Sequence, residues 1–331
     1  MKNQNLIIAE VGSVHDGSFG NAIKLIDLSK EVGANVIKFQ THISEFETLK
    51  NAPNPSYFNK ESRYDYFNRT SFIRDQWLEL IEHSNKSKIK FLSSPFSIEA
   101  AQFLNEIGCE FFKVASGEVN NTPLLEELVK MGKPVLLSSG MSNWDELDEA
   151  FDILKTNCDI TILQCSSIYP CPYEQVGLNV MQEMKERYKC KVGFSDHTPG
   201  LSAPIAAATL GASVIEKHLT FSKKMYGSDA KNSMEPSEFS SLSRSLKEVW
   251  TMLSNPVDKS NFSEYKEMKL IFEKSIVASQ DIKIGEKLQK NHFNFKKPGD
   301  GIPAKDYKKI IGLKSKKLIK IDEKINYQDL E

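Results

Sequence analysis

Two histidines stand at the ends of short apolar runs, where together they could bind a metal ion. His197 ends the run VGFSDH, and His218 ends the run VIEKH. If these runs are neighbouring strands, which lie about 4.8 Å apart, both imidazoles can reach one ion above the strand ends. Two nitrogen ligands leave positions open for water and a substrate carbonyl, as in a Lewis-acid site. A pair of hydrogen-bonded core histidines is the alternative, and the spacing leaves both open.

Lysines and serines at the ends of other runs predict a site for an anion. Lys38 and Lys113 supply point charges, and hydroxyls and backbone N–H groups at helix starts supply directed hydrogen bonds to a phosphate. The hydroxyls of this set belong to Ser94, Ser116 and Ser139. The sequence has no G-x-G-x-x-G after its first strand and no G-x-x-x-x-G-K-[ST], so the common nucleotide-binding loops are absent. His15 stays open as a site residue because it lies in the first loop, near Glu10.

The elements that must position these residues alternate between strand and helix. Eight β-type runs are expected, at 6–11, 36–40, 89–94, 111–115, 135–139, 160–165, 192–195 and 214–219. Helical patterns lie between them, and a last helix is expected at 236–253. Strict alternation predicts a parallel sheet, and eight units in about 250 residues predict a (β/α)₈ TIM barrel, with a doubly wound open sheet as the alternative. In a barrel the strand ends form the active-site face, and the long polar and aromatic connection 41–75 is expected to be an active-site loop there.

The composition divides the chain into a barrel domain at 1–254, a polar linker at 255–274 and a small β-rich domain at 275–331. The last part has 13 lysines, no arginine and 8 acidic residues, a local charge of 13 − 8 = +5. A basic β domain could bind nucleic acid, but it lacks a clear aromatic stacking platform, and scattered lysines usually solvate a surface. No nucleic-acid partner is therefore expected.

The overall composition is that of a globular protein. Among 331 residues, 43 Lys and Arg balance 44 Asp and Glu, 40% are hydrophobic and 26% are charged. No apolar run approaches the roughly 18 residues of a membrane span, and the short apolar stretch at the N-terminus, interrupted by Glu10, does not read as a signal peptide. The 5 cysteines contain no C-x-x-C pair. Reduced thiols and a cytoplasmic location are expected.

A set of ordered motifs resembles the sialic-acid synthase family. These motifs are IIAEVGSVHDGS, VIKFQTH, FLSSPF, FKVASGEVNN, PVLLSSGM, CSSIYPCP, VGFSDHT and VIEKHLT, and SIVASQDIKIGEKL is similar to the family's C-terminal antifreeze-like (SAF) domain. The resemblance covers nearly the whole chain. It implies an enzyme that condenses phosphoenolpyruvate with an acylamino-hexose to give a nine-carbon nonulosonic acid. It also implies a domain-swapped homodimer in which each antifreeze-like domain covers the partner's barrel.

The resemblance also implies a role for each matching residue. His197 and His218 match the ligands of a divalent metal, Mn²⁺ or Mg²⁺ with other divalent ions possible. The phosphoenolpyruvate-binding positions are Lys38, Ser94, Lys113, Ser116, Ser167 and Ser195. The sugar-contacting positions are Gln40, Glu118, Tyr169, Asp229 and Lys297, and the catalytic carboxylates are Glu10, Asp229 and Glu118. Which carboxylate is the base stays open.

Three positions depart from the family pattern and bear on the choice of sugar. Ser167 stands where many members have Asn, Val14 precedes His15 where many have Asn, and Lys297 replaces the usual Arg. Lysine keeps the charge but lacks the planar fork that grips a carbonyl or carboxylate at two points. The sugar is therefore N-acetylmannosamine, the first expectation, which gives N-acetylneuraminate, or a diacetamido-trideoxyhexose, which gives legionaminate or pseudaminate.

Two other functions compete with the synthase. A metal-dependent pyruvate aldolase could use the same barrel without releasing phosphate. An ice-binding module would need a regular array of threonines, and residues 275–331 contain no threonine.

Overall fold

The computed structural model describes residues 5–54, 61–227, 229–261 and 263–331. It divides into two compact units, Met1–Asn255 and Pro256–Glu331. Residues 55–60 of the long connection expected at 41–75 lie outside the described residues.

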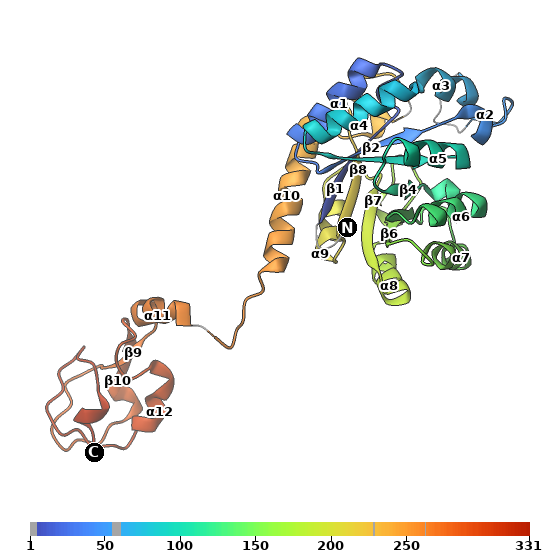
Figure 1. Ribbon diagram of the computed structural model, residues 1–331. Helices are drawn as coiled ribbons and strands as arrows, with labels where there is room; N and C mark the ends of the chain where they lie inside the picture. The colour runs from blue at the N-terminus through green and yellow to red at the C-terminus, as the bar shows by residue number, and fades with distance from the viewer. Residues whose placement is uncertain (1–4, 55–60, 228, 262) are drawn as a thin grey trace. The chain divides into compact units, whose positions relative to one another are not determined.

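Eight parallel strands close into a barrel in the order β1 to β8, as the alternation of strand and helix predicts (Figure 1). The open-sheet alternative is therefore wrong. The strands are β1 Leu6–Gly12, β2 Val36–Thr41, β3 Lys90–Pro95, β4 Phe112–Val114, β5 Val135–Ser138, β6 Ile160–Cys165, β7 Lys191–Asp196 and β8 Val214–His218. Closure comes from the pairing of β1 with β8, which sets Glu10 opposite His218.

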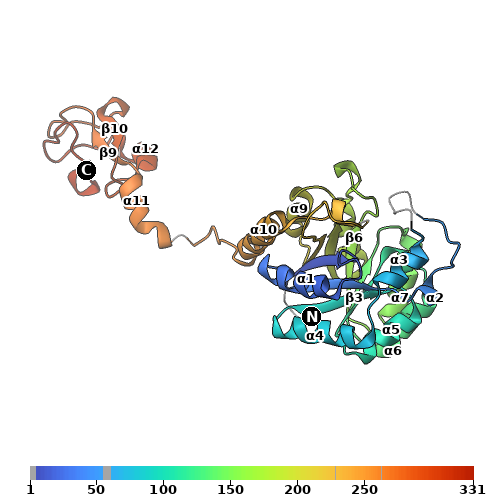
Figure 2. The same ribbon diagram turned by 90° about the horizontal axis from the view of Figure 1, so that it is seen from above.

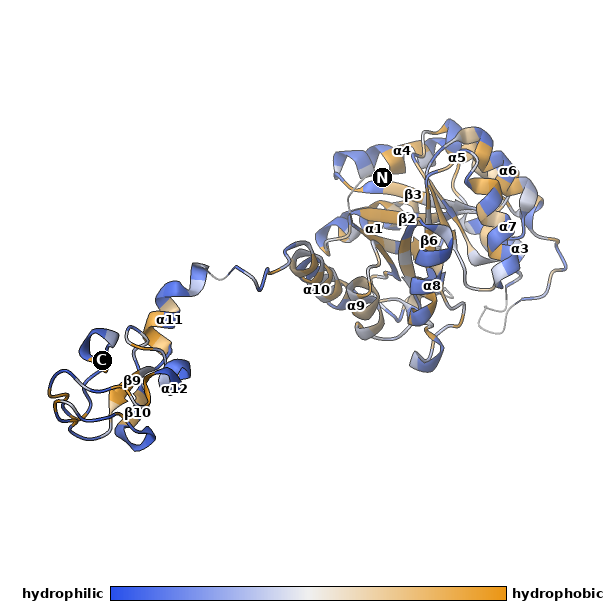
Figure 3. Ribbon diagram, turned by 90° about the horizontal axis from the view of Figure 1, so that it is seen from below, coloured by the Kyte–Doolittle hydropathy of each residue, from blue (hydrophilic) through white to orange (hydrophobic). Residues whose placement is uncertain are grey.

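Helices surround this barrel and cover its outer face (Figure 2). They are α1 Phe19–Glu31, α2 Ser44–Glu47, α3 Arg63–Thr70, α4 Arg74–Lys86, α5 Ile98–Glu106, α6 Thr122–Met131, α7 Trp144–Leu154, α8 Leu178–Tyr188, α9 Ser202–Thr209 and α10 Pro236–Ser254. Figure 3 shows hydrophobic strands at the centre and hydrophilic outer faces on the helices. None of the helices in the described part of the chain is long and apolar enough to cross a membrane.

The connection after β2 contains two short helices, α2 and α3, before α4. Ser62 caps α3, since its hydroxyl accepts a hydrogen bond from the backbone N–H of Asp65 at 3.1 Å. Tyr66, Phe67 and Thr70 form the buried face of α3. The polar and aromatic composition of this stretch therefore reflects an amphipathic helix packed on the barrel.

The barrel interior is layered because side chains of a strand alternate in direction. An apolar cluster fills its lower part: Leu6, Ile8, Val36, Leu92, Phe111, Leu136, Leu163 and Val214. Two residues further along several of these strands, the inward positions are polar, as Ile8 is followed by Glu10, Val36 by Lys38 and Val214 by Glu216. The apolar layer is thus a floor beneath the charged residues.

The unit Pro256–Glu331 has its own hydrophobic core. It contains α11 Lys266–Phe272, α12 Tyr307–Ile310, and an antiparallel pair of strands, β9 Ser275–Ala278 and β10 Phe293–Lys296. The core residues are Ile276, Ala278, Ile282, Leu288, Phe293, Ile302, Ile310, Ile319, Ile325 and Leu330. α11 lies within the range 255–274 that the sequence predicts as a linker.

Gly193 is the position at which the barrel floor tolerates no side chain. A Cβ there would lie 2.3 Å from Leu163 Cδ2 and 2.7 Å from the carbonyl oxygen of Val214. Gly193→Ala is expected to lower the free energy of unfolding by about 1–3 kcal/mol, because overpacking displaces both neighbouring strands. Urea denaturation measures the change. Gly20→Ala in α1 is the control, since a Cβ at Gly20 would meet no neighbouring atom within 4 Å, and equal stability of the two variants would contradict the packing argument.

Candidate active site

Four buried charged side chains form a cluster above the apolar floor. Glu10, Lys38, Lys113 and Glu216, here called the charge cluster, are each at most 5% exposed. Lys38 Nζ lies 2.9 Å from Glu10 Oε2 and 3.3 Å from Glu216 Oε1. Lys113 Nζ lies 3.6 Å from the same Glu216 oxygen. Two lysines and two glutamates balance in charge, which reduces the large cost of burying each ion.

The two glutamates of the cluster differ in their surroundings. Burial raises the pKa of Glu10 to about 7, and the repulsion of Glu216 adds to this effect against the attraction of Lys38. Burial also acts to raise the pKa of Glu216, but Lys113 and Lys38 outweigh it and hold that pKa well below its usual value. Ser195 adds a hydrogen bond to Glu216 Oε1 at 3.0 Å. Glu10 is therefore the carboxylate that exchanges a proton near neutral pH.

Serine hydroxyls line the wall beside the charge cluster. Ser94 Oγ lies 3.4 Å from Lys38 Nζ. Ser116 Oγ donates to Ser138 Oγ at 3.2 Å and accepts from the Gly140 N–H at 3.1 Å. A Cβ at Gly140 would lie 2.6 Å from Ser116 Oγ and 2.3 Å from Ser167 Oγ. The absence of a side chain at Gly140 thus lets the hydroxyls of Ser116 and Ser167 lie against the same stretch of backbone, and this pair of hydroxyls is here called the hydroxyl cradle.

The two histidines lie side by side at the mouth, with ring centroids 5.7 Å apart. The Nδ1–H of His197 donates to the carbonyl oxygen of Ser166 at 2.8 Å, so its Nε2 carries the lone pair when the ring is neutral. Burial lowers the pKa of His218 to about 4, which keeps this imidazole neutral. Its Nδ1 is buried without a hydrogen-bond partner among the described residues.

These observations test whether the pair could hold a metal ion. Two adjacent imidazoles, one of them neutral with an orphaned buried nitrogen, suit a divalent cation that keeps open positions. The described residues contain no group of three or more His, Cys, Asp or Glu side chains arranged for a metal. A divalent cation at this pair would therefore need water or substrate oxygens to complete its coordination.

A cavity of about 590 Å³ opens above the histidines. Five of the residues expected at the site line it: Gln40, Glu118, Tyr169, His218 and Asp229. The ring of Tyr169 packs against that of His197 in a tilted arrangement, with centroids 4.0 Å apart. Burial raises the pKa of Glu118, whose Oε2 accepts from the Asn121 side chain at 2.8 Å.

Three polar side chains converge at Gly12, where β1 has a bulge. A Cβ on this glycine, whose φ is 47°, would lie 2.7 Å from Asp229 Oδ2 and 3.2 Å from both Gln40 Nε2 and Glu10 Oε1. Gln40 Nε2 donates to Glu10 Oε1 at 2.8 Å. The absent side chain at Gly12 allows the expected catalytic carboxylates Glu10 and Asp229 to approach the same point.

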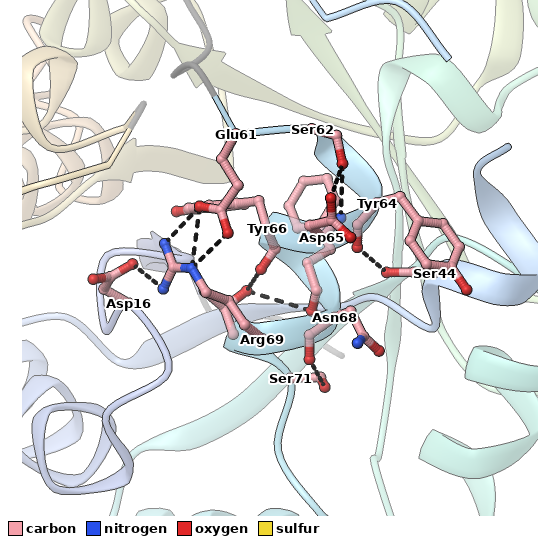
Figure 4. A network of polar contacts seen from close by, with 12 residues as sticks. Asp16, Ser44, Glu61, Ser62, Tyr64, Asp65, Tyr66, Asn68, Arg69 and Ser71 are labelled. Atoms are coloured by element: carbon pink, nitrogen blue, oxygen red, sulfur yellow. Dashed lines mark hydrogen bonds and ion pairs between the residues drawn. The ribbon is translucent and has the colours of Figure 1, made fainter. Parts of the chain in front are cut away.

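Arg69, which lies outside the cavity lining, connects several segments near the strand ends through ion pairs and ring contacts (Figure 4). Arg69 of α3 forms ion pairs with Asp16 at 2.8 Å and with Glu61 at 2.8 Å. Its guanidinium carbon also lies 5.0 Å from the ring centroid of Tyr66 and 5.9 Å from that of Tyr226. Arg69 therefore links the segment after β1 to α3 and to the segment after β8 that carries Asp229.

Some residues of the site receive no role from the sequence, and others lie apart. Glu216 stands at a strand end in the sequence, but only its contacts place it between Lys38 and Lys113. His42 and Glu47 also line the cavity. In the sequence, nothing sets them apart from other loop residues. His15 is buried, and burial lowers its pKa to about 4. Lys297 belongs to the unit Pro256–Glu331, where its Nζ lies 4.8 Å from the ring centroid of Phe272.

A closed parallel barrel whose strand ends carry buried charges, paired histidines and a deep cavity defines an enzyme of the TIM-barrel class. Residues 25–258 match the sequence model of the NeuB family, and residues 273–331 match that of the SAF domain. The chain therefore belongs to the NeuB family, as the resemblance of its motifs predicts, and is an enzyme of that family of synthases.

Relatives whose names give different products match the chain over most of its length. N,N'-diacetyllegionaminic acid synthase of Campylobacter jejuni is 38% identical over 331 residues, covering 97% of this chain and 99% of that protein. Pseudaminic acid synthase of Helicobacter pylori is 32% identical, covering 98% and 97%. Human N-acetylneuraminate-9-phosphate synthase is 38% identical over 256 residues, covering 76% and 71%.

Solved structures agree with the family assignment. N-acetylneuraminic acid synthetase of Leptospira borgpetersenii, in complex with citrate, superimposes with a TM-score of 0.70 at 31% identity and covers 80% of this chain and 90% of that one. A truncated 3-deoxy-D-arabino-heptulosonate 7-phosphate synthase of Thermotoga maritima shares the fold at 15% identity, with a TM-score of 0.58, and covers 78% and 90%.

The charge balance of the cluster can be tested through stability. Glu216→Gln is expected to lower the free energy of unfolding by about 3–5 kcal/mol, because it leaves an uncompensated positive charge between two buried lysines. Inorganic phosphate supplies the missing negative charge, so it should raise the melting temperature of this variant more than that of the wild type. Glu127→Gln, which breaks an exposed pair with Lys130, is the control. A Glu216→Gln protein as stable as this control would refute the electrostatic account.

Proposed function

We propose that the chain condenses phosphoenolpyruvate with the open-chain aldehyde of an acylamino-hexose, forming a nine-carbon nonulosonic acid and inorganic phosphate. The observation that carries this proposal is the charge cluster beside the hydroxyl cradle. Phosphoenolpyruvate carries its phosphate group and its carboxylate on the same carbon, C2. Two buried ammonium groups with a wall of hydroxyls supply the donors that such a compact anion needs. The names of the relatives support the type of product.

The site residues divide between the two substrates. Each ammonium has three N–H donors. Those of Lys38 face Glu10, Glu216 and Ser94, so a bound anion would replace the longest contact, the one to Ser94. Lys113 uses at most one donor in its ion pair with Glu216 and can direct the others to the anion. The two lysines would hold the phosphoenolpyruvate together with the hydroxyls of Ser94, Ser116, Ser167 and Ser195. The cavity would hold the sugar against the residues that line it, Gln40, Glu118, Tyr169 and Asp229.

The reaction follows from this arrangement. C3 of phosphoenolpyruvate attacks the aldehyde carbon, so that a C–C bond forms while the enol C=C and the aldehyde C=O π bonds break. The aldehyde oxygen becomes a hydroxyl by gaining a proton, which the proton later lost by water balances, and C2 becomes an oxocarbenium centre. Glu10, with its pKa near 7, can stabilise that positive charge and take a proton from the water that adds to C2. The tetrahedral intermediate then loses phosphate by cleavage of the C–O bond. Lys38 and Lys113 would hold the departing phosphate.

His197 and His218 would hold a divalent cation such as Mn²⁺ or Mg²⁺. A bound cation supplies Lewis-acid polarisation of the aldehyde oxygen. The tautomer set by the Ser166 carbonyl and the neutral ring of His218 present lone pairs to it.

The sugar is proposed to be a diacetamido-trideoxyhexose or N-acetylmannosamine. Phe67, Phe96, Leu49 and Met141 make one part of the cavity lining apolar. This lining favours a methyl group and a second acetamido group over the hydroxyls of N-acetylmannosamine. The match to the Campylobacter jejuni enzyme over nearly the whole of both chains points the same way. We also propose a cytoplasmic location, where phosphoenolpyruvate and reduced cysteines are found, and all 5 cysteines are free thiols.

Phosphate release with a panel of amino sugars tests the function. The purified protein is incubated with phosphoenolpyruvate and each sugar, and mass spectrometry identifies the product. We expect one molecule of phosphate per molecule of nonulosonic acid, with the diacetamido-trideoxyhexoses turned over faster than N-acetylmannosamine. Condensation of pyruvate without phosphate release would instead establish the aldolase. Absence of any product across the panel would contradict the proposal.

Metal removal tests the histidine pair. Excess chelator should abolish turnover, and Mn²⁺ should restore it. His218→Ala should lose Mn²⁺ binding in calorimetry while its circular dichroism spectrum is kept. His83→Ala, at a histidine paired with Asp27 outside the site, should bind Mn²⁺ as the wild type does. Full activity in excess chelator would show that the histidines serve only the core.

We also propose that the unit Pro256–Glu331 covers the barrel of a second copy in a domain-swapped homodimer. Its separate core is compatible with such an exchange. The cover would bring Lys297 to the sugar and exclude water from the oxocarbenium centre.

Mixing two inactive variants tests this arrangement. His218→Ala inactivates the barrel, and Lys297→Ala is expected to impair the cover. After subunit exchange, a swapped dimer contains one site in which both parts are wild type, so activity should partly return. If each cover serves its own barrel, every site keeps a defect and mixing restores nothing.

A further inference from the structure

His42 is held between two aromatic rings on the wall of the cavity. Its ring lies 3.6 Å from that of Phe67 in α3 and 4.2 Å from that of Phe96 after β3, measured between centroids, and both pairs are nearly parallel at 14°. The side chains of His42 and Glu47 are only 6% and 5% exposed. A histidine fixed on both faces can interact with polar groups only through its ring edge.

Both nitrogens on that edge face hydrogen-bond acceptors. Nδ1 lies 2.9 Å and 3.0 Å from the two carboxylate oxygens of Glu47. Nε2 lies 3.1 Å from Gln40 Oε1. The amide of Gln40 is oriented by Glu10, to which its Nε2 donates at 2.8 Å. A neutral imidazole has one donor and one acceptor. When Glu47 is ionised, both partners are acceptors, and only a doubly protonated ring donates to each of them.

A doubly protonated ring suits the other surroundings of His42. The carboxylate of Glu47 compensates its charge at hydrogen-bond distance, and the faces of Phe67 and Phe96 favour a cation. Other titratable groups near this wall include Glu118, which faces Glu47, and Arg63, whose guanidinium lies 6.0 Å from the Phe67 centroid. Burial lowers the pKa of nearby His15 to about 4, and Asp229 and His218 line the same cavity. The charged group nearest to the His42 ring is therefore the carboxylate of Glu47.

We propose that His42 is a positioning residue. Its charged ring is held by Glu47 and donates to Gln40 Oε1, which fixes the orientation of the Gln40 amide. In that orientation Gln40 presents its N–H group, and not its carbonyl oxygen, to Glu10. The contacts form one chain, Glu47 to His42 to Gln40 to Glu10, from the cavity wall to the carboxylate at the reacting centre. If Gln40 were free to turn, its carbonyl oxygen would face Glu10 and disfavour the carboxylate form. This inference rests on the proposed function only for the role of Glu10 in catalysis.

Kinetics separate positioning from a structural role. His42→Phe keeps the aromatic stack but removes both edge contacts, and Glu47→Gln keeps the shape but removes the charge. Each is expected to lower kcat about tenfold, as loss of a charge-assisted hydrogen bond does, while the KM for phosphoenolpyruvate is unchanged. His83→Phe, outside the site, is the matched control and should keep the wild-type kcat.

The decisive kinetic comparison is a double-mutant cycle with Gln40. If His42 acts through Gln40, His42→Phe should have no further effect on kcat in a Gln40→Ala protein. Effects that multiply would show that His42 acts independently, and the positioning role would be wrong.

A spectroscopic measurement tests the chain of contacts from Glu47 through His42 to Gln40 without any substrate. In protein labelled with ¹⁵N-histidine, with the signal of His42 assigned by its absence in His42→Phe, both ring nitrogens should carry hydrogen at neutral pH. Glu47→Gln should remove one of the two. A single N–H in the wild-type ring would overturn the proposal. If no sugar in the panel yields phosphate, the proposed function fails. The ring signals of His42 still decide whether its ring donates to both Glu47 and Gln40.

Discussion

The structure depends on the burial of four charges inside the barrel. An ion moved from water into a protein interior loses several kcal/mol of hydration, which only nearby opposite charge and hydrogen bonds can offset. Lys38 meets this requirement by lying between Glu10 and Glu216, and Lys113 by lying on the far side of Glu216. The apolar layer below excludes water from this cluster. The interior is therefore neutral as a whole but dense in donors, which suits a small multivalent anion.

Above the charge cluster, polar side chains lie close to the backbone at two glycines. Gly12 lets two carboxylates and an amide converge, and Gly140 leaves space between two serine hydroxyls. Above them, the segment after β2 supplies His42, Glu47 and Arg69, which link the strand ends to the surrounding loops. The proposed anion site thus lies within the barrel strands, whereas the proposed sugar site is lined largely by the connections between strands and helices.

The sequence predicts the barrel well because its evidence is periodic: eight apolar runs separated by helical patterns leave few other arrangements. It also predicts that Lys38, Lys113, His197 and His218 share one face, since parallel strands bring their ends together. The sequence could not predict contacts between the side chains of residues that are distant in the chain. Glu216 resembles any polar residue at a strand end until its distance to two lysines is known, and the helix α3 was hidden in a polar, aromatic stretch. The edge contacts of His42 depend on side-chain directions that no spacing reveals.

The charge cluster is proposed to bind a phosphorylated enol whose C–O bond breaks during the reaction. Phosphoenolpyruvate labelled with ¹⁸O at the oxygen bridging C2 and phosphorus tests this proposal directly, with the enzyme and the sugar it turns over. The account predicts that the label leaves in inorganic phosphate, because water supplies the new oxygen at C2. Label retained in the organic product would show that the P–O bond breaks and would contradict the account.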